Sequence, residues 1–443
     1  MISRGGDPGV RTAGRRGETY LALAAVTLFL LVRLALLVAR EPFFDELFTV
    51  WMAHKPLAQI LPALRLDSGP PAYYFLARIP DVIALRVLSL LFATATLLLI
   101  LTRRSLGPGR FFAAALLAVY PPAVLFAVDA RAYAMCGLFV ALGAVAVHEK
   151  RPFLAAGAFL LAAYTHWYGA LFLPLVLLAG RPRRRAAGAF IAACILFVPG
   201  LWLAVRQPAE ATEWLAAQNP LAAAGTFLFT GQYAEALFAS APLLVSLISG
   251  LALVAAVSRS WTFAPYVLVP LLLAVAVALG GRTVYFPMRF ESLIAVPLVL
   301  WTGTSLQEWT PRVRAILLGV LLVCGGAGTA IGILDHAQRP VDPYREAATV
   351  LQRNARPADT VVATGFLYLE TVHALGPGRV RAWPAEQATH PGWRIMRPVT
   401  DPLPPGAFLW IGERAAPELA TLRRPRQATI LFANDRAVIL RVR

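Results

Sequence analysis

The sequence predicts an all-α polytopic membrane bundle followed by a small C-terminal α/β domain. Of its 443 residues, 58% are hydrophobic and only 15% are charged, whereas soluble domains carry roughly 25% charged residues. The mean hydropathy is +0.64, and long runs of Leu, Ala and Val recur along most of the chain. Together these observations exclude a chain of soluble domains, a disordered chain and a fibrous repeat.

A helix of about 20 apolar residues crosses the hydrocarbon core of a bilayer. Measured against this length, the sequence contains about 11 candidate transmembrane helices. They occupy residues 20–39, 82–101, 111–128, 132–148, 153–165, 167–180, 186–205, 239–257, 262–280, 290–306 and 315–334. The fifth and sixth candidates are short, so we expect them to be tilted or one of them to be partly re-entrant.

The net charge of +17 comes almost entirely from arginine. Such a balance could indicate nucleic-acid binding, but membrane proteins collect arginine in their cytoplasmic loops. With a cytoplasmic N-terminal tail, most basic connections fall on one side of the bundle: Arg4, Arg11, Arg15, Arg16, Arg103, Arg104, Arg110, Lys150, Arg151, Arg181, Arg183, Arg184, Arg185, Arg259, Arg312 and Arg314. We therefore expect a cytoplasmic N-terminus and no nucleic-acid partner.

The same alternation divides the chain into three parts. Residues 1–19 form a cytoplasmic tail, residues 20–334 form the membrane module with a first external loop at 40–81, and residues 335–443 form an extracytoplasmic domain. The last part has no apolar run of membrane length. Its pattern predicts a helix near 344–351 and short strands near 360–364, 408–411, 428–432 and 436–442.

Acidic residues gather in the predicted external connections, opposite the basic loops. The first external loop carries Asp45 and Glu46 and is otherwise half apolar, which predicts amphipathic helices on the membrane surface. The later external connections carry Asp129, Arg131, His166, Glu210, Glu213, Glu235, Arg282, Arg289 and Glu291. Charged groups at the lip of a bundle are costly unless they face water or each other, so this side is the candidate site.

Each of these groups also has a structural interpretation that the sequence leaves open. Asp45 could be a solvated acid or a helix N-terminal acid, and Asp129 with Arg131 could form an ion pair at a turn. His166, between aromatic residues, could be a hydrogen-bonded interface residue. Arg289 could anchor the bundle at the membrane interface or hold a phosphate, which suits the guanidinium fork.

The order of five short motifs resembles that of glycosyltransferases with the GT-C fold. These motifs are Phe-Asp-Glu at 44–46, Gly-Pro-Pro-Ala-Tyr-Tyr at 69–74, Asp-Ala-Arg-Ala-Tyr-Ala at 129–134, Tyr-Thr-His-Trp-Tyr at 164–168 and Arg-Phe-Glu at 289–291. More closely, the chain resembles the bacterial branch related to protein mannosyltransferases and aminoarabinose transferases. The resemblance covers nearly all of the membrane module.

This resemblance implies a multi-pass enzyme of the bacterial inner membrane. It would move a sugar from a polyprenyl-phosphate carrier to a glycan, lipid or protein acceptor at the outer face, with inversion. Asp45 would be the general base, Asp129 would orient the acceptor, and Glu46 would be a further catalytic carboxylate. The implied substrate- and phosphate-binding residues are Arg131, Arg289, His166, Tyr133 and Tyr73. Some relatives need a divalent cation, Mg²⁺ or Mn²⁺, for which Asp45 and Asp129 would supply oxygen ligands.

The sequence departs from the family pattern at two places. Many relatives carry Lys or His just before the Pro-Pro pair, where this chain has Ser68-Gly69, and the later motif usually has Tyr where this chain has Phe290. Donor phosphate binding would then depend on other cations, for which the candidates are Arg65, Arg78, Arg131 and Arg289.

Two other classes of function remain as alternatives. A transporter or flippase of lipid-linked saccharides should place polar groups near the bilayer midplane, where Arg33 and Arg86 are the main candidates. A non-catalytic membrane assembly protein would tolerate loss of Asp45.

Overall fold

The computed structural model describes residues 8–39, 42–180, 182–208, 242–280, 289–338, 343–364, 367–376, 378–383, 406–412, 428–433 and 437–443. The chain forms two compact units. The bundle unit comprises Met1–Arg40, Ile83–Ala204 and Leu215–Ala337, and the α/β unit comprises Glu41–Val82, Val205–Trp214 and Gln338–Arg443. Glu210, Glu213, Glu235 and Arg282 lie outside the described residues.

The bundle unit is all helical, as predicted. Its helices are α1 (Pro8–Ala39), α5 (Val82–Thr102), η1 (Arg104–Leu106), α6 (Gly109–Val119), α7 (Pro121–Leu125), α8 (Tyr133–His148), α9 (Pro152–Thr165), η2 (Trp167–Leu178), α10 (Arg183–Ala204), α14 (Pro242–Val257), α15 (Pro265–Leu279), α16 (Arg289–Leu306) and α17 (Pro311–Gln338). Each predicted span coincides with one of these helices, except the span at 111–128, which covers both α6 and α7. Within the described residues, four are long and apolar enough to cross a membrane, namely Gly17–Leu37, Val82–Thr102, Arg183–Ala204 and Pro311–Ile331.

Two predicted spans differ in form from the expectation. The span expected at 111–128 is interrupted, because α6 ends at Val119 and a separate short helix, α7, begins at Pro121. Proline disfavours helical backbone at the preceding residue and cannot donate a backbone hydrogen bond, so Pro121 and Pro122 account for the break. The span expected at 167–180 is a 3₁₀ helix, η2, with Pro174 inside it.

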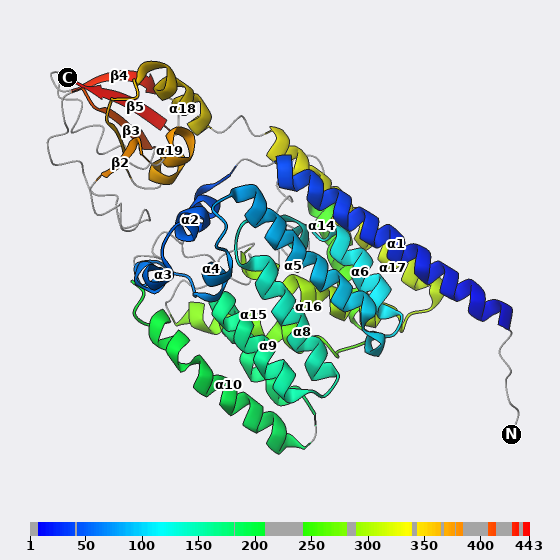
Figure 1. Cartoon of the computed structure of the whole chain (residues 1–443). Helices are drawn as coiled ribbons and strands as arrows, with labels where there is room; N and C mark the ends of the chain where they lie inside the picture. Colours follow the sequence, from blue (N-terminus) through cyan, green and yellow to red (C-terminus); the bar gives the residue numbers. More distant parts are fainter. Residues whose placement is uncertain are drawn as a thin grey trace, which may run out of the picture. The chain divides into compact units, whose positions relative to one another are not determined.

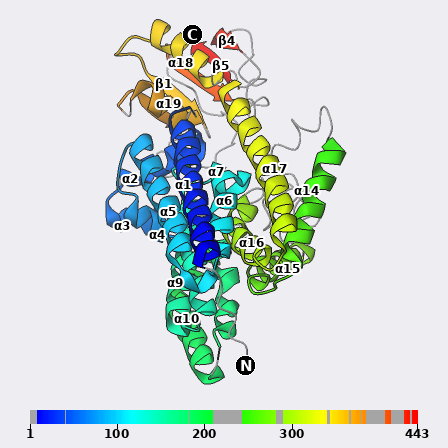
Figure 2. The same ribbon diagram turned by 90° about the vertical axis from the view of Figure 1, so that its right-hand side faces the viewer.

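Helix α16 forms the centre of the bundle unit. All its residues from Phe290 to Leu306 are buried, and it packs against α6, α7, α8, α14 and α15. Figure 2 shows α14 and α15 beside it, and in Figure 1 α8, α9 and α10 follow one another along the bundle. A helix that is apolar on all sides and buried along its length is typical of the centre of a membrane bundle.

Two glycines let α6 and α16 approach at backbone distance. A Cβ atom on Gly303 would lie 2.5 Å from the carbonyl oxygen of Gly109 and 2.6 Å from the backbone nitrogen of Ala113. A Cβ atom on Gly109 would lie 2.8 Å from the carbonyl oxygen of Gly303. Small residues at such crossings allow the close packing that drives association of membrane helices.

The α/β unit combines the first predicted external loop with the C-terminal domain. The loop forms α2 (Phe44–Ala53), α3 (Leu57–Leu64) and α4 (Ala72–Leu76). The C-terminal part contains α18 (Pro343–Asn354), β1 (Val361–Thr364), α19 (Leu367–Leu375), β2 (Val380–Trp383), β3 (Phe408–Gly412), β4 (Ala428–Ala433) and β5 (Ala437–Val442). Helix α2 packs against α19, so the loop and the domain share an interface inside this unit.

The strands form one five-stranded sheet in the order β2-β1-β3-β5-β4. Strand β1 runs parallel to β2 and β3, while β5 runs antiparallel to β3 and β4. Helices α18 and α19 pack on the sheet, and their side chains join Phe408, Trp410 and Ile439 in one apolar core. This arrangement confirms the predicted α/β domain and adds β2 and α19, which the sequence pattern did not indicate.

We expect Gly303→Ala to destabilise the bundle, because the new methyl group would overlap the backbone of α6. Overpacking of this kind costs about 1–3 kcal/mol, which thermal unfolding of the purified chain in detergent would measure. Gly319→Ala in α17 is the matched control, because a Cβ atom there meets nothing within 4 Å and alanine favours a helix. Equal melting temperatures for the two variants would contradict the close approach.

Candidate functional site

The candidate site in the bundle unit begins at the broken end of α6. A helix leaves its last four carbonyl groups without intrahelical partners, and in a membrane interior each unsatisfied group is costly. Here the carbonyl of Leu116 accepts a bond from the amide of Tyr120 at 2.8 Å. The carbonyl of Val119 accepts one from the hydroxyl of Thr329 in α17, also at 2.8 Å.

Arg33 of α1 satisfies the other two carbonyls. Its Nη2 donates to the carbonyl of Leu117 at 2.9 Å, and its Nη1 donates to that of Ala118 at 3.2 Å. Nη2 also reaches the carbonyl of Ala123 in α7 at 3.1 Å. The side chain is fully buried, and its guanidinium carbon lies 3.6 Å from the ring centre of Phe29. A buried arginine therefore replaces the hydrogen bonds that the helix loses at its break.

The connection after α7 carries Asp129 and Arg131. The backbone is held from α5, because the hydroxyl of Ser89 donates to the carbonyl of Asp129 at 2.5 Å and lies 3.5 Å from that of Arg131. The amide of Arg131 donates to the carbonyl of Asp129 at 2.6 Å, which closes a tight turn. Asp129 is 2% exposed, so its carboxylate belongs to the interior of the unit and is not a solvated loop charge.

A chain of aromatic rings joins three of the motifs in this unit. Phe126 packs edge-on against Tyr133 at 4.8 Å between ring centres, and Tyr133 lies 5.5 Å from the ring of His166. His166 lies 4.9 Å from Tyr168, which lies 5.3 Å from Phe290. Motifs that are far apart in the sequence, at 129–134, 164–168 and 289–291, are therefore neighbours in space. Aromatic pairs at such separations stabilise one another beyond their buried area.

His166 lies within the electrostatic influence of two arginines, Arg131 and Arg289. It sits in the connection between α9 and η2, where its Nδ1 accepts a hydrogen bond from the amide of Tyr168 at 3.3 Å. Burial first, and then the charges of Arg131 and Arg289, lower the pKa of His166 to about 3. The imidazole is therefore neutral at physiological pH with its proton on Nε2. The two arginines come from different motifs and act on the same ring.

The structure adds Glu291 and Tyr120 to the candidate site. Glu291 is fully buried in the first turn of α16, where the helix dipole favours a carboxylate. It lies close enough to Tyr120, at the break between α6 and α7, to interact with it electrostatically. The sequence placed Glu291 in an external connection but gave it no role, because the burial of this carboxylate depends on contacts with helices distant in the chain.

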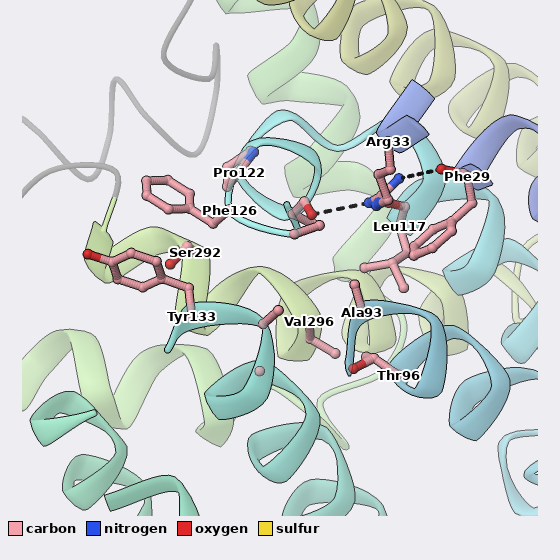
Figure 3. Close-up of a pocket in the computed structure, with 14 residues that line it drawn as sticks. Phe29, Arg33, Ala93, Thr96, Leu117, Pro122, Phe126, Tyr133, Ser292 and Val296 are labelled. Atoms are coloured by element: carbon pink, nitrogen blue, oxygen red, sulfur yellow. Dashed lines mark hydrogen bonds between the residues drawn. The ribbon is translucent and has the colours of Figure 1, made fainter. Parts of the chain in front are cut away.

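A pocket in the bundle unit opens between these elements (Figure 3). Its lining is mostly apolar, with polar groups at Arg33, Thr96, Tyr133 and Ser292. Figure 3 shows Arg33 at one end and Tyr133 with Ser292 at the other. Of these four residues, the sequence gave Tyr133 a substrate-binding role and Arg33 a role only under the transporter alternative. The signal that could have indicated the pocket is the single arginine within the first apolar span.

The other predicted site residues belong to the α/β unit. Asp45 and Glu46 lie in the first turn of α2, with Asp45 partly exposed and Glu46 buried. Tyr73 of α4 is 1% exposed, and its ring packs edge-on against Tyr74 at 6.0 Å. The side-chain amide of Gln207 holds the preceding turn by donating to the carbonyls of Leu64 and Gly69 at 2.9 and 2.8 Å.

The predicted residues thus fall into two sets. The bundle unit brings together Asp129, Arg131, Tyr133, His166 and Arg289, and the α/β unit holds Asp45, Glu46 and Tyr73. The meeting of Asp45 with Asp129 stays a prediction. Among the described residues, no three His, Cys, Asp or Glu side chains are grouped so that they could hold a metal ion. A divalent cation shared by Asp45 and Asp129 also stays a prediction.

The lowered pKa of His166 predicts a pH dependence of stability. Between pH 3 and 6.5 the unfolded chain binds a proton at this residue and the folded chain does not, so the free energy of unfolding rises with pH over this range and levels off above it. We expect His166→Gln to make the free energy of unfolding less dependent on pH in this range, by up to about 1.4 kcal/mol per pH unit. The change would be measured from melting temperatures at pH 5 and pH 7, with His54→Gln, at an exposed histidine, as the control. The same pH dependence in His166→Gln and in the unaltered chain would contradict a neutral buried imidazole.

Comparison with known structures identifies the fold. The chain is similar to the crystal structure of ArnT from Cupriavidus metallidurans in the apo state, with a TM-score of 0.57 and 13% identity over 97% of this chain and 98% of ArnT. It is similar to ArnT bound to undecaprenyl phosphate with a TM-score of 0.53 and 13% identity over 96% and 97% of the two chains. No family model and no curated protein sequence matches the chain. The chain has the fold of ArnT, and the GT-C fold expected from its motifs is confirmed.

Proposed function

We propose that the chain is an inverting membrane glycosyltransferase that moves a sugar from a polyprenyl-phosphate donor to an acceptor at the outer face of the bacterial inner membrane. The observation that carries this proposal is the convergence of three motifs around His166, with Arg131 and Arg289 beside a neutral imidazole. Two guanidinium groups suit an anionic phosphate. The likeness to an ArnT structure that holds undecaprenyl phosphate supports the choice of donor.

The proposed reaction is one displacement at the anomeric carbon. Asp45 takes the proton of the acceptor hydroxyl as its oxygen attacks C1, and the bond from C1 to the carrier phosphate breaks with its electron pair on the phosphate oxygen. Arg289 and Arg131 stabilise the charge that develops on this leaving group. Asp129 and Glu46 orient the acceptor and the sugar, and attack from the opposite face inverts the anomeric configuration.

The bundle supplies what a soluble enzyme would lack, an apolar environment for the carrier. The pocket beside Tyr133 is lined mainly by apolar side chains and lies in the same unit as the two arginines. His166 fits a binding role better than an acid–base role, because an imidazole with a pKa of about 3 is too weak a base to take up a proton near neutrality. We propose that its Nε2–H donates to the phosphate or to a sugar hydroxyl.

The flippase alternative has one observation in its favour, the broken helix at Val119. Transporters often bind substrates at such interruptions, where free backbone groups face the pathway. In this chain the carbonyls at the break are taken up by Tyr120, Arg33 and Thr329. Because these bonds leave the end of α6 satisfied within the protein, we favour the enzyme.

The central experiment is a transfer assay with a panel of polyprenyl-phosphate sugars and the purified full chain. We expect Asp45→Asn and Asp129→Asn each to lower turnover by at least about 10²-fold. The loss of a general base has this effect for Asp45, and misplacement of the acceptor by about 1 Å has it for Asp129. Glu308→Gln is the control, because this exposed carboxylate lies just beyond the C-terminal end of α16, whereas Glu291 and the candidate site lie at the N-terminal end. Transfer that is indifferent to both aspartate changes would overturn the mechanism.

The phosphate clamp has its own test. We expect Arg289→Gln to lower turnover by about 10²–10³-fold, as the loss of one preorganised charge donor does in other enzymes. Arg289→Lys should recover only part of this loss, because an ammonium group cannot form the two parallel bonds of a guanidinium. If the glutamine variant instead transferred sugar at the normal rate, Arg289 would be an interfacial anchor.

The same preparations distinguish the enzyme from the flippase. In vesicles, a flippase would move a labelled lipid-linked sugar between leaflets without forming a new glycoside. The enzyme would form a glycosylated acceptor, detectable by mass spectrometry, and release polyprenyl phosphate. Leaflet exchange without a glycosylated product would favour the flippase and contradict the proposal.

A further inference from the structure

We infer that Arg33 is a positioning residue of the site. It bonds α1 to both sides of the break between α6 and α7, and thereby fixes the position of the connection at residues 126–133. This inference rests on the proposed function for its catalytic consequence. Its structural part, the control of one connection by one buried side chain, can be tested separately.

The distribution of its hydrogen bonds distinguishes Arg33 from an ordinary helix cap. Two of its bonds end on α6, at the carbonyls of Leu117 and Ala118, and a third ends beyond the break, on the carbonyl of Ala123. A fourth, from Nη1, returns to the carbonyl of Phe29 in its own helix at 3.3 Å. The guanidinium therefore fixes α7 relative to α6, where the chain itself provides no continuous helix (Figure 3).

Few residues separate this anchor from the site. After Ala123 the backbone is held by the amide of Val124 on the carbonyl of Tyr120 and by the amide of Ala127 on that of Val124. The ring of Phe126 then packs on Tyr133, the first link of the aromatic chain that reaches His166. A displacement of Ala123 would therefore be transmitted to Phe126, Asp129 and Tyr133.

The chemistry of the side chain explains why an arginine occupies this place. Its planar fork presents several donors in a fixed geometry, so it can serve carbonyls on two helices at once, which an ammonium group does poorly. Its charge is costly in an apolar interior, and contact with the ring of Phe29 offsets part of that cost. A residue needed only to fill space would be apolar here.

The test compares Arg33→Met and Arg33→Lys with Thr329→Val in the full chain. The control removes a bond at the same helix end, to the carbonyl of Val119, which belongs to α6 and not to α7. We expect Arg33→Met to speed amide exchange in residues 120–131 by about tenfold or more, while exchange in α8 and α16 changes by less than about twofold. Thr329→Val should leave residues 123–131 unchanged, and Arg33→Lys should fall between the two.

In the transfer assay we expect Arg33→Met to lower kcat by about 10²-fold, the scale of a misplacement of about 1 Å, with the donor KM within about threefold. Unchanged exchange in residues 120–131 would overturn the inference, and so would faster exchange throughout the bundle unit, which would make Arg33 a general stabiliser. Selective loosening with unchanged kcat would also overturn it. If the unaltered chain transfers no sugar but Arg33→Met still speeds amide exchange selectively in residues 120–131, the proposed function is refuted. The anchoring of the connection by Arg33 would then still hold.

Discussion

The organisation of the bundle unit depends on one constraint, the need to satisfy the backbone where α6 stops inside an apolar environment. Pro121 and Pro122 end the helix, and the carbonyls at its end must find donors from elsewhere. Arg33 of α1 and Thr329 of α17 supply them. Because these donors come from the two ends of the membrane module, the break joins distant parts of the chain and creates a fixed point from which the 126–133 connection starts.

Beyond the break between α6 and α7, ring packing determines the geometry of the site more than charge does. The aromatic chain from Phe126 to Phe290 determines where the 129–134, 164–168 and 289–291 motifs meet, and the charged side chains follow from it. The imidazole of His166, which lies within the electrostatic influence of Arg131 and Arg289, is neutral and adds no further positive charge. Under the proposed function, a neutral His166 would leave the binding of the phosphate charge to the two arginines.

Much of this structure could be predicted from the sequence, because apolar run length and arginine placement are local signals. They located the bundle helices, and alternating patterns located β1, β3, β4 and β5. The break of the span expected at 111–128 also has a local signal, the Pro121-Pro122 pair. The partners of Arg33 could not be predicted, since they lie on α6 and α7, more than 80 residues away. The same holds for the burial of Glu291, and the meeting of Asp45 with Asp129 remains a prediction.

The 3₁₀ form of η2 has a consequence for reach. A 3₁₀ helix rises about 2.0 Å per residue where an α-helix rises about 1.5 Å, so its 12 residues extend over roughly 24 Å instead of about 18 Å. A segment too short to cross the hydrocarbon layer as an α-helix thereby comes close to doing so. The stretched winding gives poorer hydrogen-bond geometry, and in return the chain covers this distance within a dozen residues. His166 directly precedes one end of η2, and Arg183 follows shortly after the other end.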